Sequence, residues 1–303
     1  VGCKKYKDGS HDAIIAIGGG SAMDGGKLIC LTANNDIPLR DFEFELTPPK
    51  ISKDNPFPKI ITIPTTAGTG AETEITAMVT YLKEGMKFCM WHPDARPVLA
   101  LVDPELTLGL PPSLTAWTGV DAMVHAIEGY CVPGFNPLCD GSAIESLSLI
   151  SKSLYLAVEE PKNLVARGGM HVGSYLGGVA FLKGLGLVHA ISHMVGAEFN
   201  TQHGLTNAII LPVVLRYNLS GMDEKVKRMS EAMQFEDHSI EAFITNIEKM
   251  LDRLNIPKSL SEIGVPEDCV ERIANKAMKD QAFATNPKIA TLEEVKEMTL
   301  ASI

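Results

Sequence analysis

The chain has 303 residues, of which 45% are hydrophobic and 21% charged, and its formal net charge is −10. These are ordinary proportions for a globular protein that is long enough to form two domains with a sizeable core. An acidic chain is repelled by nucleic-acid phosphates and by anionic lipid. We therefore expect neither a nucleic acid nor a membrane surface as a partner.

The cysteine pattern and the ends of the chain indicate a compartment. The six cysteines form no CxxC pair, which in a chain of this length is typical of reduced thiols. No apolar run reaches the roughly 20 residues of a membrane span, and no signal-peptide apolar stretch stands at the start. The sequence predicts a cytoplasmic protein. Because a strand follows Val1 almost at once, we also expect a chain that starts in the middle of a fold.

The first third alternates short apolar runs with helix-like stretches. Strands are predicted over residues 13–17, 59–63, 75–81 and 98–102, with a helix over 22–32. Continuous apolar strands separated by helical stretches are typical of a largely parallel α/β sheet that is buried on both faces.

Two glycine-containing loops follow predicted strands. The first, Gly18 to Ser21, stands before a possible helix start, and the second runs from Pro64 to Glu72. Glycines let the backbone approach a diphosphate, and the free N–H groups of a helix start attract it. A tight structural turn is the alternative for either loop alone. In an open α/β sheet both loops lie beyond the carboxyl ends of the strands, so together they favour a nucleotide site.

Helical periodicity replaces the apolar runs from residue 111 onward. Helices are predicted over 143–159, 163–182, 239–254, 269–279 and 292–300. The prolines between 104 and 111 mark a boundary, which gives an α/β domain of residues 1–106 and a helical domain of residues 107–303. The glycines within 163–182 indicate close helix packing or helix breaks, and the sequence leaves both open.

Histidines gather in the helical half. Asp121 and His125 are four residues apart, His189 and His193 repeat this spacing, and His203 follows. On a helix each pair shares one face, and a carboxylate with several imidazoles suits Fe²⁺ or Zn²⁺. The spacing does not decide which of His189, His193 and His203 are ligands. The remaining histidines are interpreted as structural or surface residues: His11, His92, His171 and His238.

Taken in order, these motifs resemble the iron-containing (group III) alcohol dehydrogenases, a family that includes lactaldehyde reductase and propanediol dehydrogenase. The resemblance runs along nearly the whole chain, through residues 18–24, 64–70, 103–104, 119–130 and 186–207. It implies a dehydroquinate synthase-like fold. In that fold a Rossmann-like α/β domain, here N-terminally incomplete, precedes an all-α metal-binding domain.

The resemblance also implies roles for individual residues. The four metal ligands, for iron and sometimes zinc, are Asp121, His125, His189 and His203, and His193 assists proton transfer beside the nicotinamide. By the same resemblance the pyrophosphate loop consists of Gly19, Gly20, Ser21 and Asp24, and a second cofactor loop contains Thr65, Thr66 and Thr69. Lys87 contacts the ribose, and Leu106 and Leu110 lie on the adenine side.

The implied reaction is hydride transfer between NAD(H), with NADP as the alternative, and a small primary alcohol, its aldehyde or a diol. The implied assembly is a homodimer or a higher homo-oligomer. Phe135, Phe181 and the neighbours of Tyr130 would line the substrate pocket.

The sequence leaves two alternative functions open and departs from the family pattern in two places. The alternatives are a zinc enzyme of the glycerol dehydrogenase or dehydroquinate synthase type, and a truncated, non-catalytic relative that binds metal and nucleotide. Glu74 stands where many relatives carry a cofactor-contacting threonine. The family's earlier strands, including the one whose acidic residue disfavours NADP, do not precede the glycine turn.

Overall fold

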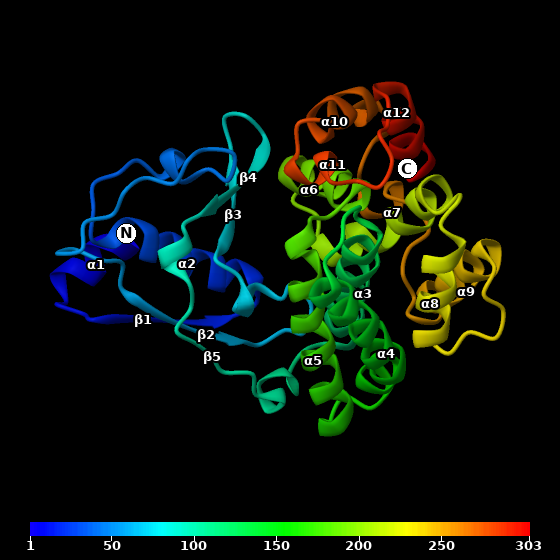
Figure 1. The fold of residues 1–303 in the computed structure, drawn as a ribbon, viewed down its shortest axis with the longest axis horizontal. Helices are drawn as coiled ribbons and strands as arrows, with labels where there is room; N and C mark the ends of the chain where they lie inside the picture. The colour runs from blue at the N-terminus through cyan, green and yellow to red at the C-terminus, as the bar shows by residue number, and fades with distance from the viewer.

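A small α/β part and a larger helical part lie side by side in the computed structural model, which describes residues 1–303 (Figure 1). After α1 (Gly2–Asp8), strands β1 (Ala13–Gly18), β2 (Lys59–Pro64) and β5 (Leu99–Ala100) form a parallel sheet in the order β1-β2-β5. Helix α2 (Gly20–Ala33) covers one face of this sheet through buried apolar side chains such as Met23 and Leu31. The predicted strands at 13–17 and 59–63 and the helix at 22–32 are confirmed, and the strand at 98–102 shrinks to two residues.

A hairpin of β3 (Thr76–Tyr81) and β4 (Met86–Trp91) stands apart from the parallel sheet. The two strands are antiparallel, with Thr76 opposite Trp91. The prediction that residues 75–81 belong to a largely parallel sheet is therefore wrong, and β4 was not predicted. The physical reason is the connection: only four residues join the strands, with Gly85 at φ 58°, and a parallel crossover needs a dozen or more residues.

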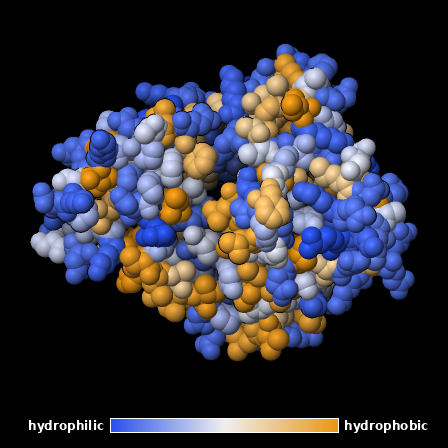
Figure 2. All heavy atoms as spheres, viewed as in Figure 1, coloured by the Kyte–Doolittle hydropathy of each residue, from blue (hydrophilic) through white to orange (hydrophobic).

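The second face of the parallel sheet is bare. Ile15, Ile17 and Leu99 are 63%, 56% and 51% exposed, and Figure 2 shows hydrophobic atoms gathered where Figure 1 places β1, β2 and β5. The prediction of a sheet buried on both faces is wrong for this chain, because no helix of the chain covers that face.

The helical part surrounds one large hydrophobic core. Its long helices are α3 (Pro112–Cys131), α4 (Pro137–Glu159), α5 (Leu164–Ala180), α6 (Leu187–Phe199), α7 (His203–Asn218), α8 (Asp223–Ala232) and α9 (Ile240–Arg253). The C-terminal cap consists of α10 (Val270–Ala277), α11 (Gln281–Ala284) and α12 (Leu292–Ala301). All five predicted helices are present. Helix α5 is unbroken, and its glycines let it pack closely against α3 and α4.

Short 3-10 turns complete the fold: η1 (Leu39–Phe42), η2 (Ala71–Thr73), η3 (Pro93–Ala95), η4 (Pro104–Thr107), η5 (Phe181–Lys183), η6 (Ser261–Ile263) and η7 (Glu267–Cys269). Turn η4 lies on the segment that joins the two parts. No single helix is long and apolar enough to span a membrane. The segments Leu164–Lys183 and Leu187–Phe199 reach that length and hydropathy only when taken together, and the chain bends by 105° between them.

Candidate metal and cofactor site

Four side chains from three helices converge in the helical part. Asp121 and His125 come from α3, His189 from α6 and His203 from the first turn of α7. Asp121 Oδ1 lies 3.8 Å from His125 Nε2, 3.8 Å from His189 Nε2 and 3.6 Å from His203 Nε2. The four candidate ligand atoms all lie within 4.8 Å of one another. The structure thus brings together the four residues predicted as metal ligands.

A glycine contact places His203 in this cluster. A Cβ at Gly204 would lie 2.2 Å from the carbonyl oxygen of Trp117 on α3, so only glycine allows α7 to approach α3 this closely. Gln202 begins the helix by accepting a hydrogen bond from the N–H of Leu205 at 2.6 Å. Gly204 therefore allows the close contact between α7 and α3 that brings its neighbour His203 to the cluster.

The cluster fits a divalent cation. The edge of a tetrahedron is about 1.6 times its centre-to-corner distance, so the three edges that meet at Asp121 correspond to ligand distances of about 2.2–2.3 Å, close to those of zinc sites. Asn207 Nδ2 lies 2.7 Å from Asp121 Oδ1, 3.1 Å from His189 Nε2 and 3.2 Å from His203 Nε2. Because an amide has two hydrogens, it cannot satisfy three acceptors. At least one of these three acceptor atoms therefore keeps a free lone pair, which is what a cation site offers to the ion.

Two of the three histidine rings have the protonation state that a metal ligand needs. Burial lowers the pKa of His125 to about 4 and holds the pKa of His203 well below its ordinary value. Both rings are therefore neutral at pH 7 and present lone pairs, as a metal ligand must. Burial also acts to lower the pKa of His189, but the hydrogen bond and charge of Glu128 outweigh it and raise that pKa.

Partners behind the ligands hold two of the rings in place. His125 Nδ1 donates to the carbonyl oxygen of Gly68 at 3.2 Å, and His189 Nδ1 donates to Glu128 Oε2 at 2.6 Å. Such outer contacts orient metal-binding histidines. Sequence reasoning missed Glu128 and Asn207. Their spacing was a usable signal, because Glu128 follows Asp121 by seven residues and Asn207 follows His203 by four, so each lies on its ligand's helix face.

His193 lies beside the cluster but outside the group of four. Its ring stacks on that of His203, with centroids 5.4 Å apart, and its Nδ1 donates to Asp280 Oδ2 at 2.9 Å. Asp280 is itself fixed, because its other oxygen accepts the N–H of Ala282 at the start of α11. With Nδ1 occupied, the free nitrogen of His193 is Nε2. Asp280 stands 87 residues away in the chain, and nothing in the sequence connects the two.

The two aromatic residues predicted for the substrate pocket separate. The ring of Phe181 lies 4.8 Å from that of His125, beside the metal cluster. Phe135 is 94% exposed, because it lies in the loop between α3 and α4. That Phe135 lines the substrate pocket stays a prediction.

The two glycine-containing loops meet at the carboxyl ends of β1 and β2. Gly19 caps α2, and a Cβ at Gly20 would lie 2.7 Å from Thr69 Cγ2. The first N–H groups of α2, those of Gly20 and Ser21 among them, have no partners within the helix. The buried hydroxyl of Thr66 also lacks a partner. Free donors on facing loops form a cradle that fits a diphosphate, and Thr65 belongs to the same loop, its N–H donating to the carbonyl oxygen of Gly18 at 2.9 Å.

The remaining predicted cofactor residues lie around this cradle. Asp24 Oδ2 accepts the N–H of Met78 at 3.3 Å, which ties α2 to the hairpin. Lys87 on β4 reaches α6, where its Nζ lies 3.4 Å from the Cβ position of Gly196, and burial lowers its pKa. On the connecting segment Leu106 is 40% exposed. Figure 2 shows that the surface is hollowed between the two parts.

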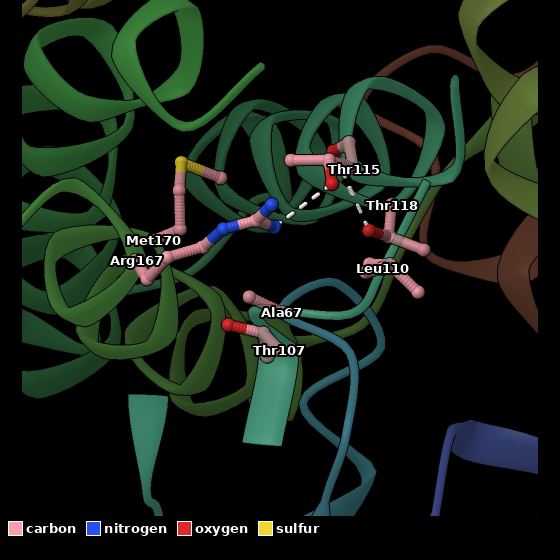
Figure 3. Close-up of a pocket in the computed structure, with 7 residues that line it drawn as sticks. All are labelled: Ala67, Thr107, Leu110, Thr115, Thr118, Arg167 and Met170. Atoms are coloured by element: carbon pink, nitrogen blue, oxygen red, sulfur yellow. Dashed lines mark hydrogen bonds between the residues drawn. The ribbon is translucent and has the colours of Figure 1, made fainter. Parts of the chain in front are cut away.

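A small cavity occupies the junction behind the second loop (Figure 3). Arg167 donates to Thr115 Oγ1 at 2.8 Å and to the carbonyl oxygen of Pro161 at 3.1 Å, and its Nη2 has no partner. The volume is about 10 Å³, room for roughly one water molecule, so this cavity is not the substrate pocket. Its lining is Ala67, Thr107, Leu110, Thr115, Thr118, Arg167 and Met170.

Comparisons with known proteins cover both parts of the chain. The family model "Iron-containing alcohol dehydrogenase" matches residues 1–104, and "Fe-containing alcohol dehydrogenase family, C-terminal" matches residues 115–303. The chain is 34% identical over 304 residues to the NAD-dependent methanol dehydrogenase of Bacillus methanolicus, covering 98% of this chain and 78% of that protein. It is 36% identical over 302 residues to the lactaldehyde reductase of Escherichia coli K12, covering 97% and 77%. The crystal structure of a 1,3-propanediol oxidoreductase superposes with a TM-score of 0.93 at 32% identity, covering 99% of this chain and 79% of that one.

Proposed function

The chain belongs to the iron-containing alcohol dehydrogenase family, and we propose that its site transfers a hydride between NAD(H) and a small primary alcohol, its aldehyde or a diol. The family match makes the protein an oxidoreductase of alcohols and aldehydes that uses iron and a nicotinamide cofactor. The observation that carries the proposal is the convergence of Asp121, His125, His189 and His203 in the helical part.

The chain's own residues divide the work. Asp121 and the three histidines would hold the metal ion, which when bound polarises the oxygen of the alcohol or aldehyde. The N-terminus of α2 and the Thr65–Thr69 loop would bind the cofactor diphosphate, and NAD(H) when bound accepts or supplies the hydride. Lys87 would contact the ribose, and Leu106 and Leu110 the adenine side.

Proton movement falls to His193. Its Nδ1–H is held by Asp280, so Nε2 is the atom that takes the hydroxyl proton during oxidation and returns it during reduction. Phe181 packs against His125 and supplies an apolar wall beside the cluster. Such a wall excludes water and favours a small, mostly apolar substrate.

Two variants test the assignment. We expect His203→Ala to lose bound metal, because it removes one of four ligands, and His193→Ala to keep the metal but lower turnover by about 10²–10⁴-fold, as for loss of a proton-transfer group. Metal per chain is measured by elemental analysis, NADH binding by titration of the same sample, and turnover with 1,2-propanediol and methanol. Equal metal loss in both variants would refute the separate roles, and a chain that binds neither metal nor NADH would refute the function.

Location, assembly and domain roles are further parts of the proposal. All six cysteines are free thiols, which supports a reducing, cytoplasmic compartment. The bare apolar sheet face supports a homodimer or higher homo-oligomer, because exposed apolar patches of this kind favour association. Residues 1–106 would bind the nucleotide and residues 107–303 the metal. Light scattering of the purified chain tests the assembly, and a monomer at micromolar concentration would contradict it.

A further inference from the structure

A buried carboxylate lies behind the metal cluster at the far end of α3. Glu128 is 5% exposed. Its Oε2 lies 2.6 Å from His189 Nδ1, and its Oε1 accepts the backbone N–H of Val188 at 2.8 Å. One side chain from α3 therefore holds both the first turn of α6 and a proposed metal ligand on that turn.

The start of α6 is built to receive this side chain. Its N-cap, Gly186, has no side chain to satisfy the first N–H groups, and a Cβ there would lie 2.7 Å from Asn286 Oδ1 and 2.8 Å from Glu128 Oε1. Those two side chains take over the capping: Asn286 accepts from the N–H of Leu187 at 3.0 Å, and Glu128 accepts from Val188. Unlike Asn286, Glu128 also reaches the histidine ring.

The contact with the ring determines where its proton lies. An ionised carboxylate only accepts hydrogen bonds, so the neutral His189 ring carries its hydrogen on Nδ1 and its lone pair on Nε2. Nε2 is the nitrogen that faces Asp121. Among the three ligand histidines this is the only anchoring by a carboxylate, because His125 donates to a backbone carbonyl and Nδ1 of His203 has no partner.

We infer that Glu128 is a positioning residue that fixes the tautomer of His189 and thereby sets the affinity of the metal site. The inference rests on the proposed metal-binding function. It adds a residue that touches neither metal nor substrate but decides whether one ligand presents a lone pair or a proton to the cluster.

Glu128→Gln is the sharpest variant, because it keeps the shape and the cap. Its amide oxygen still accepts the N–H of Val188, but its NH₂ group can only donate. To accept this hydrogen bond on Nδ1, a neutral His189 must carry its own hydrogen on Nε2. We expect the dissociation constant for Zn²⁺ or Fe²⁺ to rise about 10–100-fold, the usual cost of losing an outer-shell partner. The affinity is measured by competition with a chromogenic chelator, and the melting temperature of the metal-free chain should stay close to that of the wild type.

Asn286→Ala is the matched control. It removes the neighbouring cap of the same helix but leaves His189 untouched, so we expect a lower melting temperature and an unchanged metal affinity. Wild-type affinity in folded Glu128→Gln, or equal loss of affinity in both variants, would overturn the inference.

A measurement on the wild-type chain covers the case in which Glu128→Gln does not fold. The ¹⁵N shifts of His189 in the metal-free protein, measured at a pH at which the ring is neutral, report which ring nitrogen carries the hydrogen, and we expect Nδ1. A hydrogen on Nε2 overturns the inference. If the wild type binds no metal, the proposed function fails, whereas the tautomer of His189 still decides the inference separately.

Discussion

The carboxyl group of Glu74 should weaken the fold as the pH rises. Burial raises the pKa of Glu74 to about 7, and the negative charges of Asp24 and Glu72 add to this effect. Lys27 and a hydrogen bond from Thr76 act in the opposite direction without cancelling it. Because the ordinary value is 4.5, the folded chain binds more protons at this position than the unfolded chain between pH 4.5 and 7.

The sign and size of the effect follow from linkage. Where the folded state binds more protons, its stability falls as the pH rises. The stabilisation that comes from protonated Glu74 is fully present below pH 4.5 and lost above pH 7. Each unit of difference between the folded and unfolded pKa corresponds to 1.36 kcal/mol, so the folded chain is less stable by about 3 kcal/mol at pH 8. With an unfolding entropy of about 2.1 cal/mol/K per residue, this is about 5 °C in the melting temperature.

Glu74→Gln removes the charge and keeps an oxygen that accepts the Thr76 hydroxyl. We expect the variant to melt about 5 °C above the wild type at pH 8 and at nearly the same temperature at pH 4.5, measured by scanning fluorimetry without cofactor. Glu297→Gln, at an exposed carboxyl, should change neither value. A gain of equal size at both pH values, or no gain at pH 8, would refute the electrostatic reasoning.

Three further substitutions test other parts of the fold by urea unfolding. Gly68→Ala places a Cβ 2.6 Å from the carbonyl oxygen of Thr118 and should cost about 1–3 kcal/mol; an unchanged midpoint would show that the loop moves aside freely. Burial lowers the pKa of His171 to about 4, and both ring nitrogens lack hydrogen-bond partners. The free energy of unfolding of the wild type should therefore fall by up to about 3 kcal/mol as the pH falls from 6.5 to 4, and His171→Leu should not show this loss. Arg167→Met removes the hydrogen bonds to Thr115 and Pro161 and should cost about 1–3 kcal/mol, whereas a variant as stable as the wild type would show that these bonds contribute nothing net.

The local half of the candidate site was readable from the chain. Asp121 and His125 are one helical turn apart, and so are His189 and His193, so helical geometry alone places each pair on one face. The same holds for the glycine loop, since Gly19 follows β1 directly and caps α2.

Contacts between distant segments were not readable. The spacing did not choose His203 over His193, because that choice depends on how closely α7 approaches α3 at Gly204. Asp280 behind His193 and the bare face of the sheet were not predicted for the same reason. The antiparallel pairing of β3 with β4 is different, because only four residues join these strands and the short connection was a local signal that the prediction did not use.

The sequence by itself determined the helices, the strands next to the glycine loops and the residue types available for a metal and a nucleotide. These depend on neighbours a few positions away, where backbone geometry leaves little choice. Only the tertiary structure decided which histidine joins the cluster and which stands beside it, because packing in three dimensions selects among residues that local periodicity treats alike. It also decided that Glu128 orients His189.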